Sequence, residues 1–365
     1  GFPNYPDGVI PEPYRGRLLL RERLGDVRVV RSAVYPAPNR GFARRVVNHA
    51  SFALSSVLAA PLTPAPDVVI AETPPLFTAA SGVAIARARR TPLILNVADL
   101  WPDSAVQLGA LSNPRAIALA ERLERFAYRH SAAITVPTAG IRNTLLERGW
   151  PPDTVIHFPN AVDVERFAAL EPPAGPPRRL IYCGTVGMAQ GVGTLIDAAG
   201  ELRQTGPELE FLIVGDGAER AELAQRAIGQ GLDNVRFLGR VDRDRVPELL
   251  GGADIAALSL RDLPLFEDAL PSKLLEYMAA GRPVVASAAG DVARLLERSG
   301  GGLVSGPGDA AGLAQSIRDL VSDPDRAREL GASGRRYVSA HYSREAFVER
   351  LEEIMRGVVA GRPGP

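Results

Sequence analysis

The chain has 365 residues, and at about 150 residues per domain this length predicts two domains. Its 42 Lys and Arg residues balance 42 Asp and Glu residues, so the formal net charge of zero excludes a protein that binds nucleic acid through bulk positive charge. Hydrophobic residues make up 46% of the chain, which predicts folded cores. The single cysteine, Cys183, excludes an intramolecular disulfide and is typical of a cytoplasmic protein.

Short apolar runs alternate with helix-length segments in the first half of the chain. The predicted strands are residues 27–31, 67–71, 92–97, 132–136 and 154–158. The predicted helices include residues 42–60, 79–89 and 114–129. This alternation indicates βαβ units around a parallel sheet. No run of 18 apolar residues is present, so we expect no membrane-spanning helix.

The same alternation restarts after a proline-rich stretch, residues 168–178, which we interpret as a linker. The strands predicted after it are residues 179–183, 210–214, 235–238, 255–258, 283–286 and 302–304. The helices predicted there are residues 194–203, 220–230, 246–251, 272–280 and 310–322. The predicted fold class is therefore α/β, with two doubly wound, Rossmann-like domains facing a cleft, residues 1–167 and 179–342. Residues 343–365 are expected to form a helix that packs back toward the first domain.

The densest functional pattern follows residue 266, where Pro271 and Gly281 flank a short predicted helix. Its first turn carries Lys273, the only lysine among 42 basic residues. A helix N-terminus beside an ammonium group suits a phosphate, and Glu276, one turn later, suits ribose hydroxyls. An ordinary surface helix with a Lys/Glu pair explains the same letters, but the rarity of lysine favours a binding site.

Two turns of the second domain could approach a diphosphate or a base. Gly184 and Gly187 lie between a predicted strand and a predicted helix, where bare backbone allows close contact. The stretch matches neither a dinucleotide-binding fingerprint nor a P-loop, which disfavours dehydrogenases and P-loop enzymes. Gly215 begins a Gly-Asp-Gly turn that ordinary turn chemistry also explains.

In the first domain, Asp99 and Asp103 follow a predicted strand, where open α/β sheets place their ligands, although either could cap a helix. The four histidines show no metal-binding spacing, so no metal site is predicted. Residues Arg40–Leu62 combine a basic start with a broad apolar body, which suits a helix at a membrane surface. A buried helix with basic, solvent-facing ends explains the same segment and is the commoner case.

Several motifs together resemble family 4 retaining glycosyltransferases of the GT-B fold. These are Pro-Asn-Ala-Val-Asp at 159–163, Val-Gly-Asp-Gly at 214–217, and Pro-Ser-Lys-Leu-Leu-Glu-Tyr-Met-Ala-Ala-Gly-Arg-Pro-Val-Val at 271–285. Asp-Leu-Trp-Pro-Asp-Ser-Ala at 99–105 is similar to the subgroup of WbuB and colanic-acid-type transferases of surface-polysaccharide assembly. The first strand of that family, with its glycine-rich loop, is missing before residue 2, so we expect a preceding segment.

The resemblance implies transfer of a sugar from a nucleotide diphosphate donor, a UDP-sugar being favoured, to an acceptor hydroxyl. It implies front-face substitution without an enzymic nucleophile, a metal or a resident cofactor. The acceptor expected for this subgroup is a lipid-linked saccharide at the inner face of the plasma membrane. The residue pattern and the resemblance together predict Lys273, Asp268 and Asp99 as catalytic residues. The residues predicted to bind the donor are Glu276, Gly184, Thr185, Gly187, Gln190, Gly215, Val241, Ser272 and Leu274.

The chain departs from the family pattern at four positions. Thr185 and Gln190 stand where many relatives have an Arg and a Lys that hold the diphosphate, and Ala98 replaces a histidine. Asp268 replaces the first Glu of the E-x7-E pattern that ends at Glu276. Two other functions therefore stay open. A sugar-nucleotide epimerase of the same fold would need acid and base residues in the cleft, and a non-catalytic nucleotide-sugar-binding subunit would bind without turnover.

Overall fold

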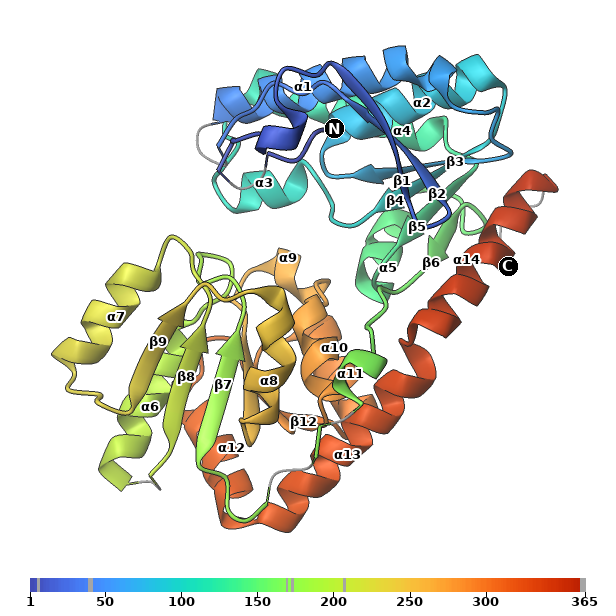
Figure 1. Ribbon diagram of the computed structural model, residues 1–365. Helices are drawn as coiled ribbons and strands as arrows, with labels where there is room; N and C mark the ends of the chain where they lie inside the picture. The colour runs from blue at the N-terminus through green and yellow to red at the C-terminus, as the bar shows by residue number, and fades with distance from the viewer. Residues whose placement is uncertain (5–6, 39–41, 169, 172–173, 206–207, 362–365) are drawn as a thin grey trace. The chain divides into compact units, whose positions relative to one another are not determined.

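The computed structural model describes the chain apart from residues 5–6, 39–41, 169, 172–173, 206–207 and 362–365 (Figure 1). The side chains of residues 42–43 and 204–205 are also outside the description. The chain folds into two compact units. Unit 1 comprises Gly1–Pro137, Ile141–Phe158 and Leu351–Pro365, and unit 2 comprises Thr138–Gly140 and Pro159–Arg350. Residues 159–167, which the sequence analysis assigned to the first domain, thus belong to unit 2.

Unit 2 is built on a six-stranded parallel sheet. Its strands are β7 (Arg179–Cys183), β8 (Glu210–Val214), β9 (Val235–Gly239), β10 (Ile255–Ser259), β11 (Val284–Ser287) and β12 (Gly302–Ser305). They lie in the order β12-β11-β10-β7-β8-β9. The order reverses between β7 and β10, and the loops after these two strands therefore diverge at the carboxyl edge of the sheet.

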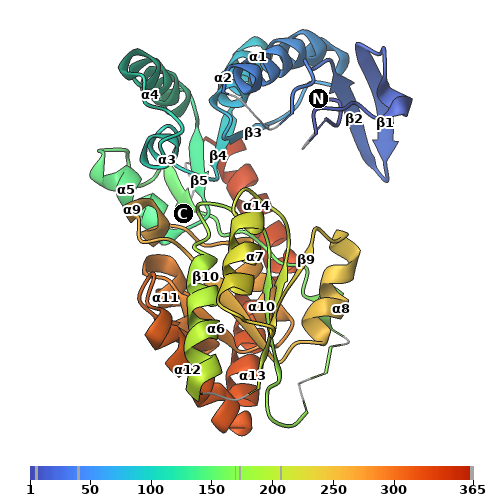
Figure 2. The same cartoon turned by 90° about the vertical axis from the view of Figure 1, so that its left-hand side faces the viewer.

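Helices follow most strands of unit 2, as a parallel sheet requires. They are α6 (Gly193–Thr205), α7 (Arg220–Gly229), α8 (Val246–Gly251), α9 (Pro264–Glu267), α10 (Ser272–Ala279), α11 (Gly290–Ser299), α12 (Ala310–Ser322) and α13 (Pro324–His341), with short 3-10 turns η3 (Glu165–Phe167) and η4 (Arg243–Arg245). Helix α14 (Arg344–Val359) begins in unit 2, and its residues from Leu351 onward belong to unit 1. Helices α6 and α12 pack side by side along one face of the sheet (Figure 2).

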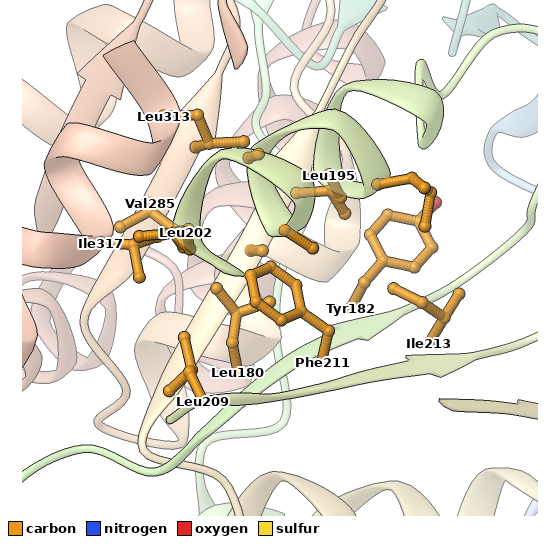
Figure 3. Packing of buried hydrophobic residues seen from close by; sticks show 14 of the residues in the cluster. Leu180, Tyr182, Leu195, Leu202, Leu209, Phe211, Ile213, Val285, Leu313 and Ile317 are labelled. Carbon is orange, nitrogen blue, oxygen red and sulfur yellow. The ribbon is translucent and has the colours of Figure 1, made fainter. Parts of the chain in front are cut away.

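The core of unit 2 lies between the sheet and these two helices (Figure 3). Alternate residues of β7 and β8 point toward α6, because side chains on a strand alternate between its faces. The packed side chains include Leu180, Tyr182, Leu195, Leu202, Phe211, Ile213, Leu313 and Ile317, each at most 2% exposed. Burying one such side chain stabilises the fold by about 1.5 to 3 kcal/mol.

Unit 1 contains a four-stranded parallel sheet in the order β3-β4-β5-β6. Its strands are β3 (Val69–Thr73), β4 (Leu93–Val97), β5 (Ala133–Val136) and β6 (Val155–His157). The helices between residues 1 and 158 are α1 (Phe42–Ala59), α2 (Leu76–Arg89), α3 (Asp103–Gln107), α4 (Pro114–Arg129) and α5 (Ala139–Glu147), with turns η1 (Glu12–Tyr14) and η2 (Ala60–Leu62). Helix α1 lies along α2 in both views (Figures 1 and 2).

The prediction for residues 27–31 was wrong in one respect. This segment is strand β2 (Val27–Ser32), but it pairs antiparallel with β1 (Leu19–Leu24) in a separate hairpin and does not join the parallel sheet. The register pairs Leu24 with Val27, so only Gly25 and Asp26 form the turn, and Gly25 has the positive φ of 60° that such tight turns favour.

Three helices of unit 2 were absent from the prediction: the short α9 and the longer α11 and α13. Helix α13 begins after Asp323, whose carboxylate accepts a hydrogen bond from the Arg326 N–H at 2.9 Å, and Pro324 occupies its first position. Helix α11 follows Gly290 and ends at Gly300, which has φ +57°. Both contain many charged residues, which obscured their apolar faces.

We expect Phe211→Ala to lower the free energy of unfolding by about 3 to 5 kcal/mol, because the ring is fully buried between β8 and α6. The matched control is Ile228→Ala, at a side chain that is 70% exposed. Urea unfolding followed by far-UV circular dichroism measures both. Equal losses for the two variants would contradict this account of the core.

Candidate functional site

The candidate site lies at the carboxyl ends of β7 and β10, where the strand order of unit 2 reverses. A glycine-rich turn, residues 184–192, follows β7 and leads into α6. The segment after β10 passes through α9 and reaches the N-terminus of α10. Val192 and Leu195 are fully buried, which anchors the turn, and the backbone of Gln190 is fixed by a bond from Ser259 Oγ to its carbonyl at 2.7 Å.

Helix α10 begins at Ser272, where the sequence predicts its start. Pro271 takes the N-cap position with extended backbone, and its carbonyl accepts the Leu274 N–H at 3.0 Å. The N–H groups of Ser272 and Lys273 have no acceptor among the described residues. Gly281, just after the helix, has φ +68°, as expected for a helix end. The helix therefore presents two backbone donors next to Lys273.

The Lys273 amine reaches into the glycine-rich turn. Nζ donates hydrogen bonds to the Tyr182 hydroxyl at 2.7 Å and to Gln190 Oε1 at 2.6 Å. It also lies 4.3 Å from the centre of the Tyr182 ring, which is cation–π distance. The amine of the only lysine in the chain thus lies beside Gln190.

Two glycines make this approach possible. A Cβ on Gly184 would lie 2.8 Å from Nζ of Lys273, so any side chain there would displace the amine. A Cβ on Gly215, at the end of β8, would lie 1.8 Å from the carbonyl oxygen of Gly184. Gly215 also has φ +133°, which side chains disfavour. The predicted Gly215 turn therefore supports the backbone of Gly184.

A second tyrosine joins α10 to β7. The fully buried Tyr277 hydroxyl accepts the Cys183 N–H at 2.8 Å and donates to the Cys183 carbonyl at 3.0 Å. Tyr277 lies one turn after Lys273, on the same face of α10. These two hydrogen bonds to the end of β7 fix the position of α10 along the sheet. They thereby also fix how far the Lys273 side chain reaches.

Burial shifts the titration of the groups around the turn. Desolvation lowers the pKa of Lys273 to about 7, an effect that neighbouring Cys183 partly offsets. Burial raises the pKa of the Cys183 thiol to about 11, with Glu276 adding to the rise and Lys273 opposing it. The amine is therefore close to half protonated at neutral pH, whereas the thiol stays neutral.

Glu276 lies one helical turn beyond Lys273, with its side chain 24% exposed. Nη2 of Arg243, in η4, is 3.5 Å from Glu276 Oε1. Arg166 donates to the Arg243 carbonyl and lies 3.3 Å from Asp244 Oδ1, so it holds the loop after β9 in place. Val241, which is half-buried, belongs to that same loop.

The remaining predicted residues of unit 2 differ in accessibility. Thr185 and Ser272 are exposed, and Gly187 has no atom nearer than 3.5 Å to an added Cβ. The side chain of Leu274 is fully buried, and its backbone N–H donates to the Pro271 carbonyl. Both the side chain and the N–H therefore already have partners within the protein. Asp268 follows α9, is half-buried, and accepts a bond from Thr138 Oγ1 on its backbone carbonyl at 2.8 Å.

In unit 1, Asp99 follows β4 and is half-buried. Burial raises its pKa, while hydrogen bonds from the Ser104 side chain and the Leu100 backbone oppose the rise. Asp103 is the first residue of α3 and forms an ion pair with Arg148, without a capping bond from its side chain. The structure thus favours an ion-pair role over the capping alternative for Asp103.

The sequence analysis missed Tyr182, Tyr277 and Arg243. Tyr182 looks like one more apolar residue of a buried strand, and nothing in the letters shows where its hydroxyl reaches. Tyr277 could have been noticed from its four-residue spacing after Lys273. Among the described residues, no group of three or more His, Cys, Asp or Glu side chains is arranged to hold a metal ion.

We expect Gly215→Ala to lower the melting temperature by several degrees, because its Cβ would collide with backbone and not with a flexible side chain. Gly229→Ala is the matched control, since nothing lies within 4 Å of an added Cβ there. Differential scanning fluorimetry compares the two. A melting temperature for Gly215→Ala equal to that of Gly229→Ala would rule out the tight contact.

Comparison with known proteins identifies related chains. Residues 177–323 match the family model described as glycosyl transferases group 1, and residues 8–161 match the glycosyl transferase 4-like domain. The chain is 29% identical over 302 residues to the colanic acid biosynthesis glycosyl transferase WcaI of Escherichia coli (strain K12), a match that covers 78% of this chain and 73% of WcaI.

A second relative is the GDP-mannose-dependent monoacylated alpha-(1-6)-phosphatidylinositol monomannoside mannosyltransferase of Corynebacterium glutamicum. It is 31% identical over 216 residues, 56% of each chain. Among solved structures, Anabaena HepE in complex with UDP and glucose is similar, with a TM-score of 0.68 at 20% identity, covering 87% of this chain and 83% of HepE.

These matches confirm the predicted GT-B fold with its two Rossmann-like units. The two family models adjoin each other along the chain and together span most of it. The chain therefore belongs to the glycosyltransferases that combine a glycosyl transferase 4-like domain with a group 1 glycosyl transferase domain.

Proposed function

We propose that this chain is a retaining glycosyltransferase that moves a sugar from a nucleotide diphosphate donor to an acceptor hydroxyl in the biosynthesis of a cell-surface polysaccharide or glycoconjugate. The observation that carries the proposal is the Lys273 amine, held in the glycine-rich turn at the carboxyl ends of β7 and β10. An amine, two unpaired N–H groups of α10 and bare glycine backbone together suit a diphosphate.

In this proposal each residue of the site has a separate task. Lys273 and the N–H groups at the start of α10 stabilise the departing diphosphate, and Gly184 and Gly187 let it approach. Glu276 accepts hydrogen bonds from the ribose, for which it must release Arg243. The backbone near Gly215 and Val241 faces the base, Thr185 and Ser272 offer hydroxyls, and Asp268 contacts the donor sugar.

The chemistry we propose needs no covalent intermediate. The bond between the anomeric carbon and the diphosphate oxygen breaks, and the acceptor oxygen bonds to the same face of the sugar. The acceptor proton passes to the departing diphosphate. Asp99 of unit 1 orients the acceptor. Catalysis then rests on positioning and on stabilising the charge of the leaving group, and it uses no resident cofactor or metal.

A UDP-sugar is the donor we favour. HepE, which shares the fold, was solved in complex with UDP and glucose, whereas the Corynebacterium glutamicum relative is named as GDP-mannose-dependent. The similarity to WcaI, named for colanic acid biosynthesis, supports an acceptor that is part of a surface polysaccharide.

The acceptor we propose is lipid-linked, and α1 of unit 1 supplies the membrane contact, at the inner face of the plasma membrane. Val47, Leu54 and Leu58 are 50%, 65% and 71% exposed, and their spacing puts them on one stripe of the helix.

The charges of this segment also suit an anionic membrane surface. Arg44 and Arg45 are exposed at the start of α1, and no Asp or Glu occurs between residues 27 and 66. Arg40, at the start of the predicted segment, lies outside the described residues. No helix in the described part of the chain is long and apolar enough to cross a bilayer.

We expect Lys273→Ala to reduce kcat by about 100-fold to 1000-fold, the usual effect of removing one group that stabilises transition-state charge. The measurement is UDP release from UDP-glucose, and GDP release from GDP-mannose, in the presence of a lipid-linked saccharide extract. Arg318→Ala, at a half-buried cation on α12, is the matched control. Unchanged turnover in a folded Lys273→Ala variant would refute the assignment.

Binding of the chain to anionic vesicles should fall at least about tenfold in the double variant Arg44→Glu/Arg45→Glu, because each arginine near such a surface contributes about 1 kcal/mol. Flotation with phosphatidylglycerol/phosphatidylcholine vesicles and with phosphatidylcholine alone measures this. Leu58→Gln should also weaken binding, whereas Leu119→Gln, 68% exposed on α4, should not. Equal flotation of all variants would exclude α1 as the contact.

A further inference from the structure

The hydrogen bonds around Lys273 can be assigned one by one. The Tyr182 hydroxyl donates its proton to the Thr185 carbonyl at 2.6 Å, so its oxygen is left to accept from Nζ. Gln190 Oε1 accepts a second hydrogen from Nζ. Gln190 itself is fixed, because its N–H bonds to the Gly187 carbonyl at 2.9 Å and its carbonyl accepts from Ser259. Two acceptors, both on rigid segments, therefore hold the amine.

These two acceptors satisfy both hydrogens of a neutral amine. A neutral –NH₂ group has two hydrogens, and both have partners here, while an ammonium has a third hydrogen that needs one. The Gly184 backbone packs close to Nζ, since an added Cβ would sit 2.8 Å away. The proposed function places the diphosphate beside this glycine.

We propose that Tyr182 and Gln190 are positioning residues that hold the Lys273 amine for the donor, and that donor binding draws one proton from solvent onto this amine. The third N–H so formed donates to a diphosphate oxygen. The inference rests on the proposed function, because it needs a diphosphate at Gly184. In this inference Gln190 carries no charge itself and instead orients the amine of Lys273, which comes from α10.

The neighbouring thiol and phenol groups of β7 and α10 stay neutral around pH 7. On β7, burial raises the pKa of Cys183 to about 11 and raises that of Tyr182 further. On α10, burial raises the pKa of Tyr277 well above its ordinary value. The carboxylates that act on this cluster among the described residues are those of Glu276, which acts on Cys183, and Glu219, which acts on Tyr182.

The sign of the pH dependence follows from the lowered pKa of Lys273, about 7. Below pH 7 most of the amine is already protonated, so donor binding takes up few protons. Above pH 7 each donor molecule must bring a proton with it, so the dissociation constant should rise about tenfold per pH unit. For the same reason, proton uptake on binding should be about 0.9 at pH 8 and about 0.1 at pH 6.

The experiment is calorimetric titration of the full chain with UDP-glucose, whose diphosphate does not titrate in this range, with GDP-mannose as the second donor. Buffers of low and high ionisation enthalpy, such as phosphate and Tris, give the number of protons taken up. We expect uptake in the wild type at pH 8 and none in Lys273→Met.

Substitutions at position 190 should move the pH profile in opposite directions. Gln190→Glu supplies a negative partner, so the decline of affinity should start at higher pH and uptake at pH 8 should vanish. Gln190→Leu and Tyr182→Phe each remove an acceptor, so the decline should start at lower pH. Gln315→Leu and Tyr337→Phe, on α12 and α13, are the matched controls and should leave the profile in place.

The outcomes separate the two proposals. If neither donor binds the wild type, the proposed function fails. If a donor binds the wild type, but proton uptake is the same in Lys273→Met, the inference fails while the proposed function stands. Shifts of the pH profile in the same direction in Gln190→Glu and Gln190→Leu would also overturn the positioning role. A general structural defect would not depend on whether the new side chain is charged or apolar.

Discussion

The removal of the Lys273 amine from water is the constraint on which the candidate site depends. A primary amine loses hydration when it is buried, and here it recovers only two hydrogen bonds and the face of one ring. That geometry requires a bare Gly184, because a side chain there would displace the amine, and it requires a bare Gly215, because a side chain there would displace the Gly184 carbonyl. The contacts of the Lys273 amine therefore depend on the ends of β7 and β8 as well as on α10. The hydrogen bonds of Tyr277 to Cys183 hold α10 at the position along the sheet where these contacts form.

The positive charge beside the glycine-rich turn comes from a residue that is distant from this turn in the sequence. The glycine-rich turn has Thr185 and Gln190 where many relatives have cationic side chains, and inspection of that turn alone would suggest a site without positive charge. In three dimensions Lys273 reaches the same turn from α10, and Gln190 becomes its acceptor. What the turn lacks is therefore supplied by a helix more than eighty residues away in the chain, which explains how family membership and missing motif residues coexist.

Much of this could be predicted from the sequence because it depends on local rules. The parallel strands follow from apolar runs, and the ends of α10 follow from Pro271 and Gly281. The antiparallel hairpin was missed because strand direction depends on a two-residue turn that the apolar pattern does not reveal. Contacts such as the Tyr182 hydroxyl with Lys273 join residues whose separation is set by the whole sheet, and no spacing along the chain encodes them. The titration of the amine could not be predicted either, since it depends on how completely those contacts exclude water.

The lowered proton affinity of Lys273 has a chemical consequence of its own. An uncharged primary amine is a nucleophile, and at neutral pH a large share of this side chain is in that form, whereas a lysine on the surface is almost wholly protonated. Because no other lysine occurs in the chain, the only lysine that an acylating or carbamylating reagent could modify is this one, in addition to the α-amino group at the start of the chain. Carbamylation by cyanate would remove the charge of this side chain, because the nitrogen becomes part of a neutral urea.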